Sequence, residues 1–402
     1  MTDAVLIGLG AMIGAGVFAA PGPAAAAGGT WLLAGLALAT VVAYANATSS
    51  AQLAALYPES GGTYVYAREQ LGSYWGFLAG WGFVVGKCAS LAAMALTFGA
   101  YTTPELARPA GIGAVVALTV VNYRGIEKTA WLTRVIVALV LSALAVVVAA
   151  ALSGGDASAA NLEAQAPQGV WGVLQSAALL FFAFAGYARL ATLGEEVRDP
   201  ERTIPKAIPL ALGIVVAVYA VVLISALLAI GPDGLADADA PLAAVVEAGR
   251  WAGLAPLVRI GAAIASAGVL LSLLAGVSRT VLSMARRREM PGFLGAVHPT
   301  HYTPHRAEVA AAAVVCAAVL IADLREAIGF SSFAVLTYYA LANASAWTLT
   351  DRQRRWPRWL AGLGVVLCVG MAFTLPLVAT SGGLTLLAVG SLGWFLTRRY
   401  RS

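Results

Sequence analysis

A glycine-interrupted apolar segment close to the start of the chain could bind an anion through its backbone. Three glycines divide the run Gly10-Ala11-Met12-Ile13-Gly14-Ala15-Gly16-Val17-Phe18. Inside a membrane no water pairs with the backbone, so an interrupted helix needs other partners for its freed N–H and C=O groups. The half-helix beyond such a break begins with unpaired N–H groups and a positive dipole end, which suit a carboxylate. The residues expected to supply these amides are Ile13, Gly14, Ala15, Gly16 and Val17.

A second segment combines aromatic and small residues around a glycine, in the run Phe181-Phe182-Ala183-Phe184-Ala185-Gly186-Tyr187. A helix break here frees carbonyl groups, which suit an ammonium group. The residues expected to contact a bound solute are Phe181, Ala183, Phe184, Ala185 and Gly186. Phe182, Phe184 and Tyr187 are candidates for the wall or gate of the site, with Phe184 preferred. Simple packing or lipid contact is the alternative for each ring.

Lys87 stands in the middle of an apolar stretch that runs from Phe83 to Ser90. A lysine at the centre of a membrane helix costs about 3 kcal/mol on insertion scales, so it is expected to be paired or functional. The alternative is a structural lysine capped by carbonyl and serine oxygens.

The composition places these residues in a membrane protein. The 402 residues are 60% hydrophobic and only 11% charged, whereas soluble domains are about a quarter charged. Spanning a bilayer takes about 20 apolar residues. On this basis we predict an all-α polytopic protein with twelve spans. They lie near residues 4–26, 30–56, 74–101, 109–123, 130–152, 171–193, 207–231, 254–281, 309–322, 328–349, 359–377 and 381–397.

The distribution of basic residues predicts the orientation. With the N-terminus in the cytoplasm, 19 of the 25 Lys and Arg residues fall at the inner side, as the positive-inside rule requires. We therefore expect a multi-pass protein of the cell membrane (plasma or inner) with both termini cytoplasmic. The formal net charge of +5 reflects this topology, and no nucleic-acid partner is expected.

No metal site is expected. Each of Cys88, Cys316 and Cys368 lies alone in a predicted span, where core packing is the simplest role. His298, His301 and His305 have a spacing that could bind metal, but Pro299 and Pro304 argue against a helix there.

The two interrupted segments occupy matching places in two five-helix blocks, 1–152 and 171–349, and residues 359–397 follow as two further helices. Interrupted helices at matching positions are the best pointer from sequence to a transporter site. The alternative is that membrane helices use glycine freely for close packing.

Five motifs in this chain, taken in order, resemble those of the amino acid–polyamine–organocation (APC) transporters. They are Gly8 to Phe18; Tyr57-Pro58-Glu59-Ser60-Gly61-Gly62-Thr63-Tyr64; Asn122-Tyr123-Arg124-Gly125; Glu195 to Pro200 with Thr203-Ile204-Pro205; and Ser278-Arg279, Met284-Ala285-Arg286, Met290-Pro291 and Pro304. The resemblance implies a LeuT-like five-plus-five inverted repeat that moves amino acids by alternating access. It also places substrate contacts at both interrupted segments.

The resemblance bears on coupling as well. In the proton-coupled branch of the family a lysine on helix 5 stands where sodium would otherwise bind, but this chain has none there; the aligned position is near Val140. We expect a proton gradient to drive transport. Lys87 is expected to take over this coupling or gating task from helix 3, bracing helix 1 or 8 when charged and releasing them when neutral. Sodium is the alternative, held by Ser266, Ser272 or Ser278 with carbonyls of helix 1. Arg189 is expected to pair with Glu195 or Glu196 as an inner gate, or to extend to the membrane interface.

The predicted activity is secondary transport of neutral amino acids, small or hydrophobic, because no Asp or Glu lies inside a predicted span to pair with a cationic side chain. The alternatives are an exchanger, a carrier of amines or polyamines, and a non-transporting amino-acid sensor. An enzyme is not expected, since no nucleophile–base pair or nucleotide motif is evident. No cofactor is expected, the partners are the amino acid and lipid, and the sequence leaves the oligomeric state open.

Overall fold

The computed structural model describes residues 2–57, 61–125, 130–154, 157–163, 167–187 and 200–399, and all regular structure in these ranges is helical. Within these ranges, eight helical stretches are long and apolar enough to cross a membrane, and three shorter helices are apolar. The prediction of an all-helical protein that crosses the membrane several times is confirmed. The count of twelve spans remains a prediction.

The helices follow one another along the chain with bounds close to those expected from hydropathy. They are α1 (Thr2–Met12), α2 (Gly16–Ala19), α3 (Pro21–Gly28), α4 (Leu32–Leu56), α5 (Thr63–Leu71), α6 (Ser73–Thr102), α7 (Ala107–Tyr123), α8 (Ala130–Ser153), α9 (Gly169–Phe184), α11 (Pro200–Asp237), α12 (Pro241–Glu247), α13 (Ala255–Arg286), α14 (His305–Ile321), α15 (Leu324–Trp347), α16 (Arg358–Ala372) and α17 (Leu377–Arg399). The short helices α5 and α12 were not expected.

The predicted interruption of the first helix is present. α1 ends at Met12, and residues 13–15 form a bend before α2 begins at Gly16. Beyond the break, α2 and α3 form one nearly continuous helix, because Ala20 keeps helical angles (φ −75°, ψ −27°). The bonds from Ala20 N–H to the Gly16 carbonyl and from Ala24 N–H to the Ala20 carbonyl run through the junction. The second half-helix therefore has a proper N-terminus at residue 16.

The interruption in the second aromatic segment starts later than expected. Phe181 to Phe184 still belong to α9, and the last residues described before residue 188, Ala185–Tyr187, form a 3₁₀ turn named η4. The carbonyls at the end of α9 are therefore those of a helix C-terminus, which carries the negative end of the helix dipole.

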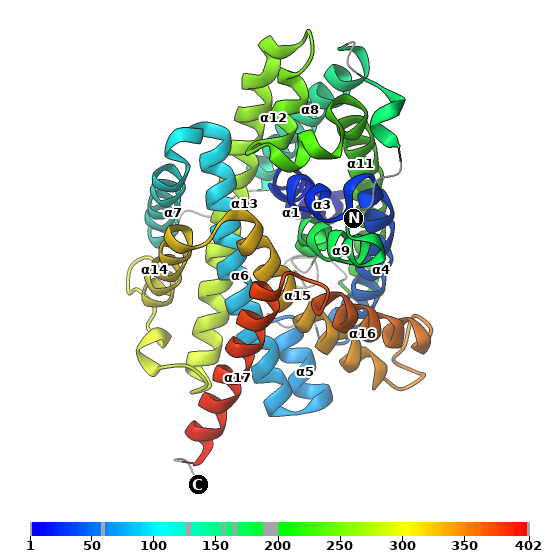
Figure 1. The fold of residues 1–402 in the computed structure, drawn as a ribbon. Helices are drawn as coiled ribbons and strands as arrows, with labels where there is room; N and C mark the ends of the chain where they lie inside the picture. Colours follow the sequence, from blue (N-terminus) through cyan, green and yellow to red (C-terminus); the bar gives the residue numbers. More distant parts are fainter. Residues whose placement is uncertain are drawn as a thin grey trace.

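The helices form two groups around the interrupted segments (Figure 1). α6, α7, α13 and α14 lie together on one side, and α3, α4, α9 and α11 lie on the other. α1 packs against α8 and α11, whereas α15 lies between the groups and contacts α4, α6 and α9. Small residues permit the close approaches: a Cβ on Gly86 of α6 would lie 2.7 Å from the Ala334 Cβ of α15.

An ionic contact fixes α5 to the end of α13. Arg68 pairs with Glu289, and the Tyr64 hydroxyl donates to the same carboxylate at 2.6 Å. Burial, followed by the hydrogen bond to Glu289, raises the pKa of Tyr64. On the other side of α5, Thr63 N–H donates to the Tyr338 hydroxyl of α15 at 3.1 Å. The turn after α4 is thereby tied to both α13 and α15.

Candidate functional site

The break between α1 and α2 contains a run of unpaired backbone donors. Gly14, Ala15, Gly16 and Val17 are all buried, and their N–H groups form no hydrogen bond with any other described residue. Nearly all buried backbone donors in proteins are paired, so four in succession call for a partner. They stand at the N-terminus of the continuous α2–α3 helix, where the dipole favours an anion. The arrangement can bind a carboxylate.

Ile13 does not belong to this donor set. Its N–H group donates to the Leu9 carbonyl oxygen at 2.6 Å, which closes the last turn of α1. Ile13 therefore lies at the rim of the break, buried to 1% exposure.

The two interruptions pack directly on each other. A Cβ on Gly16 would lie 2.7 Å from the Ala183 Cα, and a Cβ on Gly186 would lie 2.1 Å from the Ala11 carbonyl oxygen. Any side chain at either glycine would push the segments apart. The structure thus brings together the two halves of the predicted site, residues 13–17 and 181–186.

Three tyrosines, which sequence reasoning missed, hold the carbonyls of the interrupted segments. The Tyr219 hydroxyl of α11 lies 2.5 Å from the Met12 carbonyl oxygen and 3.1 Å from that of Ala183. Tyr101 donates to the Phe18 carbonyl at 3.1 Å and Tyr339 to the Ala185 carbonyl at 3.3 Å. A phenol inside the charge-free stretch 207–232 of α11 is the signal that could have found Tyr219, since a buried hydroxyl needs a partner.

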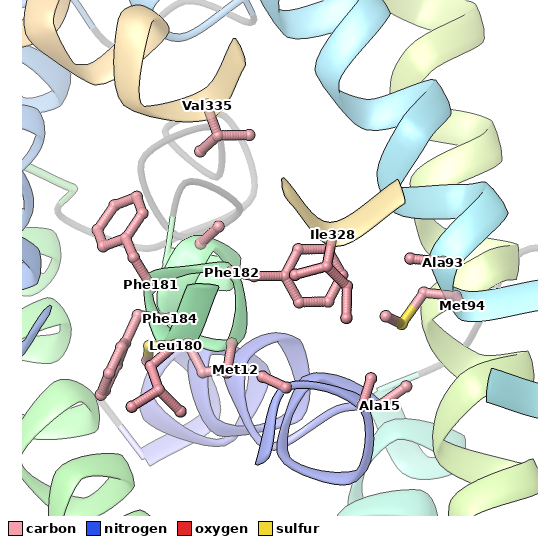
Figure 2. Close-up of a cluster of buried hydrophobic side chains, with 14 of the residues drawn as sticks. Met12, Ala15, Ala93, Met94, Leu180, Phe181, Phe182, Phe184, Ile328 and Val335 are labelled. Carbon is pink, nitrogen blue, oxygen red and sulfur yellow. The ribbon is translucent and has the colours of Figure 1, made fainter. Parts of the chain in front are cut away.

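The aromatic rings of α9 point in different directions. Figure 2 shows the Phe182 ring directed toward Ile328 and α6, whereas Phe181 and Phe184 are directed to the opposite side. Phe184 packs on Tyr219 with ring centroids 5.2 Å apart, and Phe181 packs edge-on against Tyr339 at 5.9 Å. Phe184, preferred from the sequence as the wall, is thus engaged with α11. Phe182 is the ring that reaches toward α6.

Lys87 lies on α6 and is 6% exposed. Within the described ranges it forms no hydrogen bond or ion pair. Figure 2 places Ala93 of α6 beside the site. Lys87 comes six residues earlier, which is about 9 Å along a helix. Nearby, the Ser90 and Ser331 hydroxyls join α6 to α15 at 2.6 Å. Lys87 therefore stands on the side of the site nearest α5, buried without a protein counter-ion in the described part of the chain.

Several predicted gating residues fall outside this description. Arg189, Glu195 and Glu196 lie outside the described residues, and Tyr187 is described only as the last residue of η4. The predicted inner gate therefore stays a prediction.

The serines proposed as sodium ligands are already engaged in part. Ser272 and Ser278 donate to the carbonyls of Gly268 and Ala275 in their own helix, at 2.9 and 3.1 Å. Ser266 is fully buried, and its hydroxyl has no hydrogen bond to any described residue. Val269, on the same helix α13 as these serines, lies against the break, since a Cβ added to Gly14 would be 2.5 Å from one of its methyl groups.

The histidines form an aromatic cluster with Tyr123. His298 lies 4.7 Å from His301 and 5.3 Å from His305 between ring centroids. The His298 Nδ1 atom accepts from the N–H groups of Thr300 and His301, so it is occupied in closing the turn. Within the described ranges, no group of His, Cys, Asp or Glu side chains has an arrangement that could hold a metal ion.

Apolar helices that cross the membrane several times, with two interruptions meeting in the interior, define the class of polytopic membrane transporters. Within this class the chain belongs to the amino acid permease family, whose model matches residues 1–392.

Relatives with curated descriptions agree with this family. An uncharacterized transporter of Mycobacterium tuberculosis is 58% identical over 408 residues, which cover 100% of this chain and 92% of that protein. The branched-chain amino acid permease BcaP of Bacillus subtilis is 27% identical, over 100% of this chain and 92% of its own length. The serine/threonine exchanger SteT of Bacillus subtilis is 27% identical, over 87% of this chain and 83% of its own length.

Proposed function

We propose that this protein is a secondary transporter that moves small or hydrophobic neutral amino acids across the cell membrane by alternating access. The observation that carries the proposal is the run of four buried, unpaired N–H groups from Gly14 to Val17. The substrate carboxylate binds these donors, and its ammonium binds carbonyls at the end of α9 and in η4. Backbone recognition reads the part common to all amino acids and needs no buried side-chain charge.

Side chains around the two breaks set the choice of substrate. Phe182, Ile328 and Met94 form an apolar wall beside the break (Figure 2). Such a wall favours an apolar side chain, because a cationic one would lose its hydration without gaining a carboxylate. The similarity to a branched-chain amino acid permease supports the same choice.

We further propose that a proton gradient drives transport through Lys87. A buried lysine without a counter-ion exchanges its proton more readily than a paired one, because desolvation disfavours the charged form. Charged Lys87 braces the neighbouring helices, and neutral Lys87 releases them. The proposal includes the five-plus-five inverted repeat with twelve spans, cytoplasmic termini, and a gate formed by Arg189 with Glu195 or Glu196.

An exchanger is the second candidate, and the similarity to a serine/threonine exchanger favours it. The two functions differ in whether protons move with the substrate. Purified protein in liposomes with a pH-sensitive dye inside separates them. A symporter acidifies the lumen when a neutral amino acid is added outside, whereas an exchanger supports counterflow without acidification. A sensor would bind the amino acid and accumulate none.

A further inference from the structure

A buried carboxylate that belongs to neither interrupted segment lies at the junction of three helices. Glu308 in the first turn of α14 is 1% exposed, and it precedes the apolar stretch predicted at residues 309–322. The side chain of Asn122, in the last turn of α7, is placed to act on this carboxylate as a hydrogen-bond donor. Asn122 Nδ2 also donates to the Leu271 carbonyl oxygen of α13 at 3.0 Å. α7, α13 and α14 therefore share one polar contact.

One oxygen of this carboxylate lacks a partner. Glu308 Oε1 is buried and forms no hydrogen bond with the described part of the chain. His305 lies one turn earlier on the same helix. Its Nδ1 atom is also buried and forms no hydrogen bond with a described residue. Leaving buried polar atoms unpaired costs free energy. Because residues three apart on a helix are neighbours, one proton held between Oε1 and Nδ1 would pair both atoms after a side-chain rotation.

We propose that Glu308 is a proton-binding site in which the proton is bound to Oε1 and donated in a hydrogen bond to Nδ1 of His305. Asn122 can donate to the carboxyl group in either state, because its amide carries two N–H donors. The site lies within the group formed by α6, α7, α13 and α14 (Figure 1), so its proton changes how that group is held together. The effect on transport rests on the proposed function, whereas proton binding itself does not.

The surroundings of Glu308 shift its pKa in opposite directions. Burial raises the pKa of Glu308 to about 7, although the hydrogen bond from Asn122 and the positive charge of Arg279 on α13 both lower it. The carboxyl group therefore changes state near neutral pH. The other charged or titratable groups on its helix and on the elements packed against it are Tyr74, Lys87, Cys88 and Tyr101 of α6, Arg108 and Tyr123 of α7 with Arg124 after it, Arg259 and Arg286 of α13, His298, His301 and Tyr302 of the preceding loop, and His305, Arg306 and Cys316 of α14.

Infrared difference spectroscopy tests the site on the purified full-length protein without any substrate. We expect the C=O stretch of a protonated carboxylic acid at low pH, which disappears as the pH rises from about 5 to about 9. Glu308→Gln should remove this band, and Glu69→Gln, at an exposed carboxylate of α5, should leave it. Identical spectra for the wild type and Glu308→Gln across this range would overturn the proposal.

His305→Phe provides an independent test, which also serves if Glu308→Gln does not fold. This variant keeps a ring beside Tyr123, 5.9 Å away between centroids, but removes the acceptor for the proton. The midpoint of the infrared titration should then shift to lower pH. An unchanged midpoint would overturn the role of His305 as the acceptor.

Counterflow in liposomes then measures the consequence for transport. The wild-type rate should change through neutral pH, whereas Glu308→Gln should stay near the low-pH rate of the wild type, since glutamine resembles the protonated acid. An equally pH-dependent rate in Glu308→Gln would contradict control of transport by this site. If the wild type itself fails to transport, the proposed function fails while the infrared result stands.

Discussion

The phenolic oxygen of Tyr219 lies 2.5 Å from the carbonyl oxygen of Met12, the last residue of α1 before its break. The same oxygen lies 3.1 Å from the carbonyl oxygen of Ala183, in the last turn of α9. A phenol has a single O–H donor, so it can donate to only one of these carbonyls at a time. Tyr219 therefore links the two interrupted helices, and the acceptor it selects depends on how they are placed.

Tyr219→Phe should impair transport while leaving the fold intact. The substitution removes the donor and leaves buried carbonyls unpaired, which costs about 1–3 kcal/mol. If this cost falls on the substrate-bound state, kcat/KM for uptake should drop roughly tenfold. Tyr44→Phe, at a tyrosine of α4 that is 42% exposed, is the matched control and should transport normally. Equal kcat/KM in both variants would remove Tyr219 from the mechanism.

Gly16→Ala and Gly186→Ala should each abolish transport. Their new methyl groups would meet backbone atoms at 2.7 and 2.1 Å, so the two interruptions would have to separate. Gly213→Ala is the matched control, because no atom lies within 4 Å of its added methyl. Uptake rates normalised to the amount of reconstituted protein check the comparison. Normal uptake by Gly16→Ala would show that close contact of the two breaks is not required.

Lys87→Met should uncouple transport from the proton gradient. Methionine keeps the apolar bulk of the side chain but cannot bind a proton, so gradient-driven accumulation should be lost while counterflow persists. Substrate-dependent acidification of the liposome lumen, compared with the wild type, gives the readout. Unchanged accumulation and unchanged pH dependence would reduce Lys87 to a structural residue.

The Arg68–Glu289 contact should stabilise the protein more than an exposed ion pair does. The side chains are only 19% and 8% exposed, and the pair fixes α5 to the end of α13. A double-mutant cycle should give a coupling free energy of about 1–3 kcal/mol. The Arg354–Asp351 pair, in which Asp351 is 96% exposed, serves as the comparison and should give less than about 0.5 kcal/mol. Similar coupling energies for the two pairs would contradict this account.

Glu308 should make stability depend on pH with a definite sign. Its folded-state pKa of about 7 lies above the ordinary value of 4.5, so the unfolded chain binds fewer protons between these values. Glu308 therefore lowers stability progressively as the pH rises through this interval, and by a constant amount above it. The apparent Tm of Glu308→Gln minus that of the wild type should rise with pH and then level off. A difference that is flat across the interval would argue against the raised pKa.

Much of the architecture could be predicted because apolar runs of membrane length have few alternatives to helix. The bounds of α6, predicted at 74–101 and found at Ser73–Thr102, show how closely hydropathy marks a buried span. The break at residues 13–15 was also predictable, since Gly14 and Gly16 interrupt the first apolar segment, near residues 4–26. The two short helices α5 and α12 were missed because they do not cross the membrane and carry no long apolar run.

The side-chain directions within the candidate site could not be predicted. Periodicity places Phe182 and Phe184 on one helix, but only the position of Tyr219 decides that Phe184 is engaged with α11. Tyr219 and Glu308 were missed for a related reason: their partners Met12, Ala183 and Asn122 come from distant parts of the chain. Glu308 also escaped notice because it lies one residue before the predicted span 309–322, whereas α14 begins at His305.

The most direct test of the central claim is counterflow of a radiolabelled branched-chain amino acid into liposomes that contain the purified protein. Unlabelled neutral amino acids and their methyl esters serve as competitors. If the amides of Gly14 to Val17 bind the substrate carboxylate, the label should accumulate, free amino acids should compete, and the carboxylate-blocked esters should fail. Binding of the label without accumulation, or equal competition by the esters, would contradict the account.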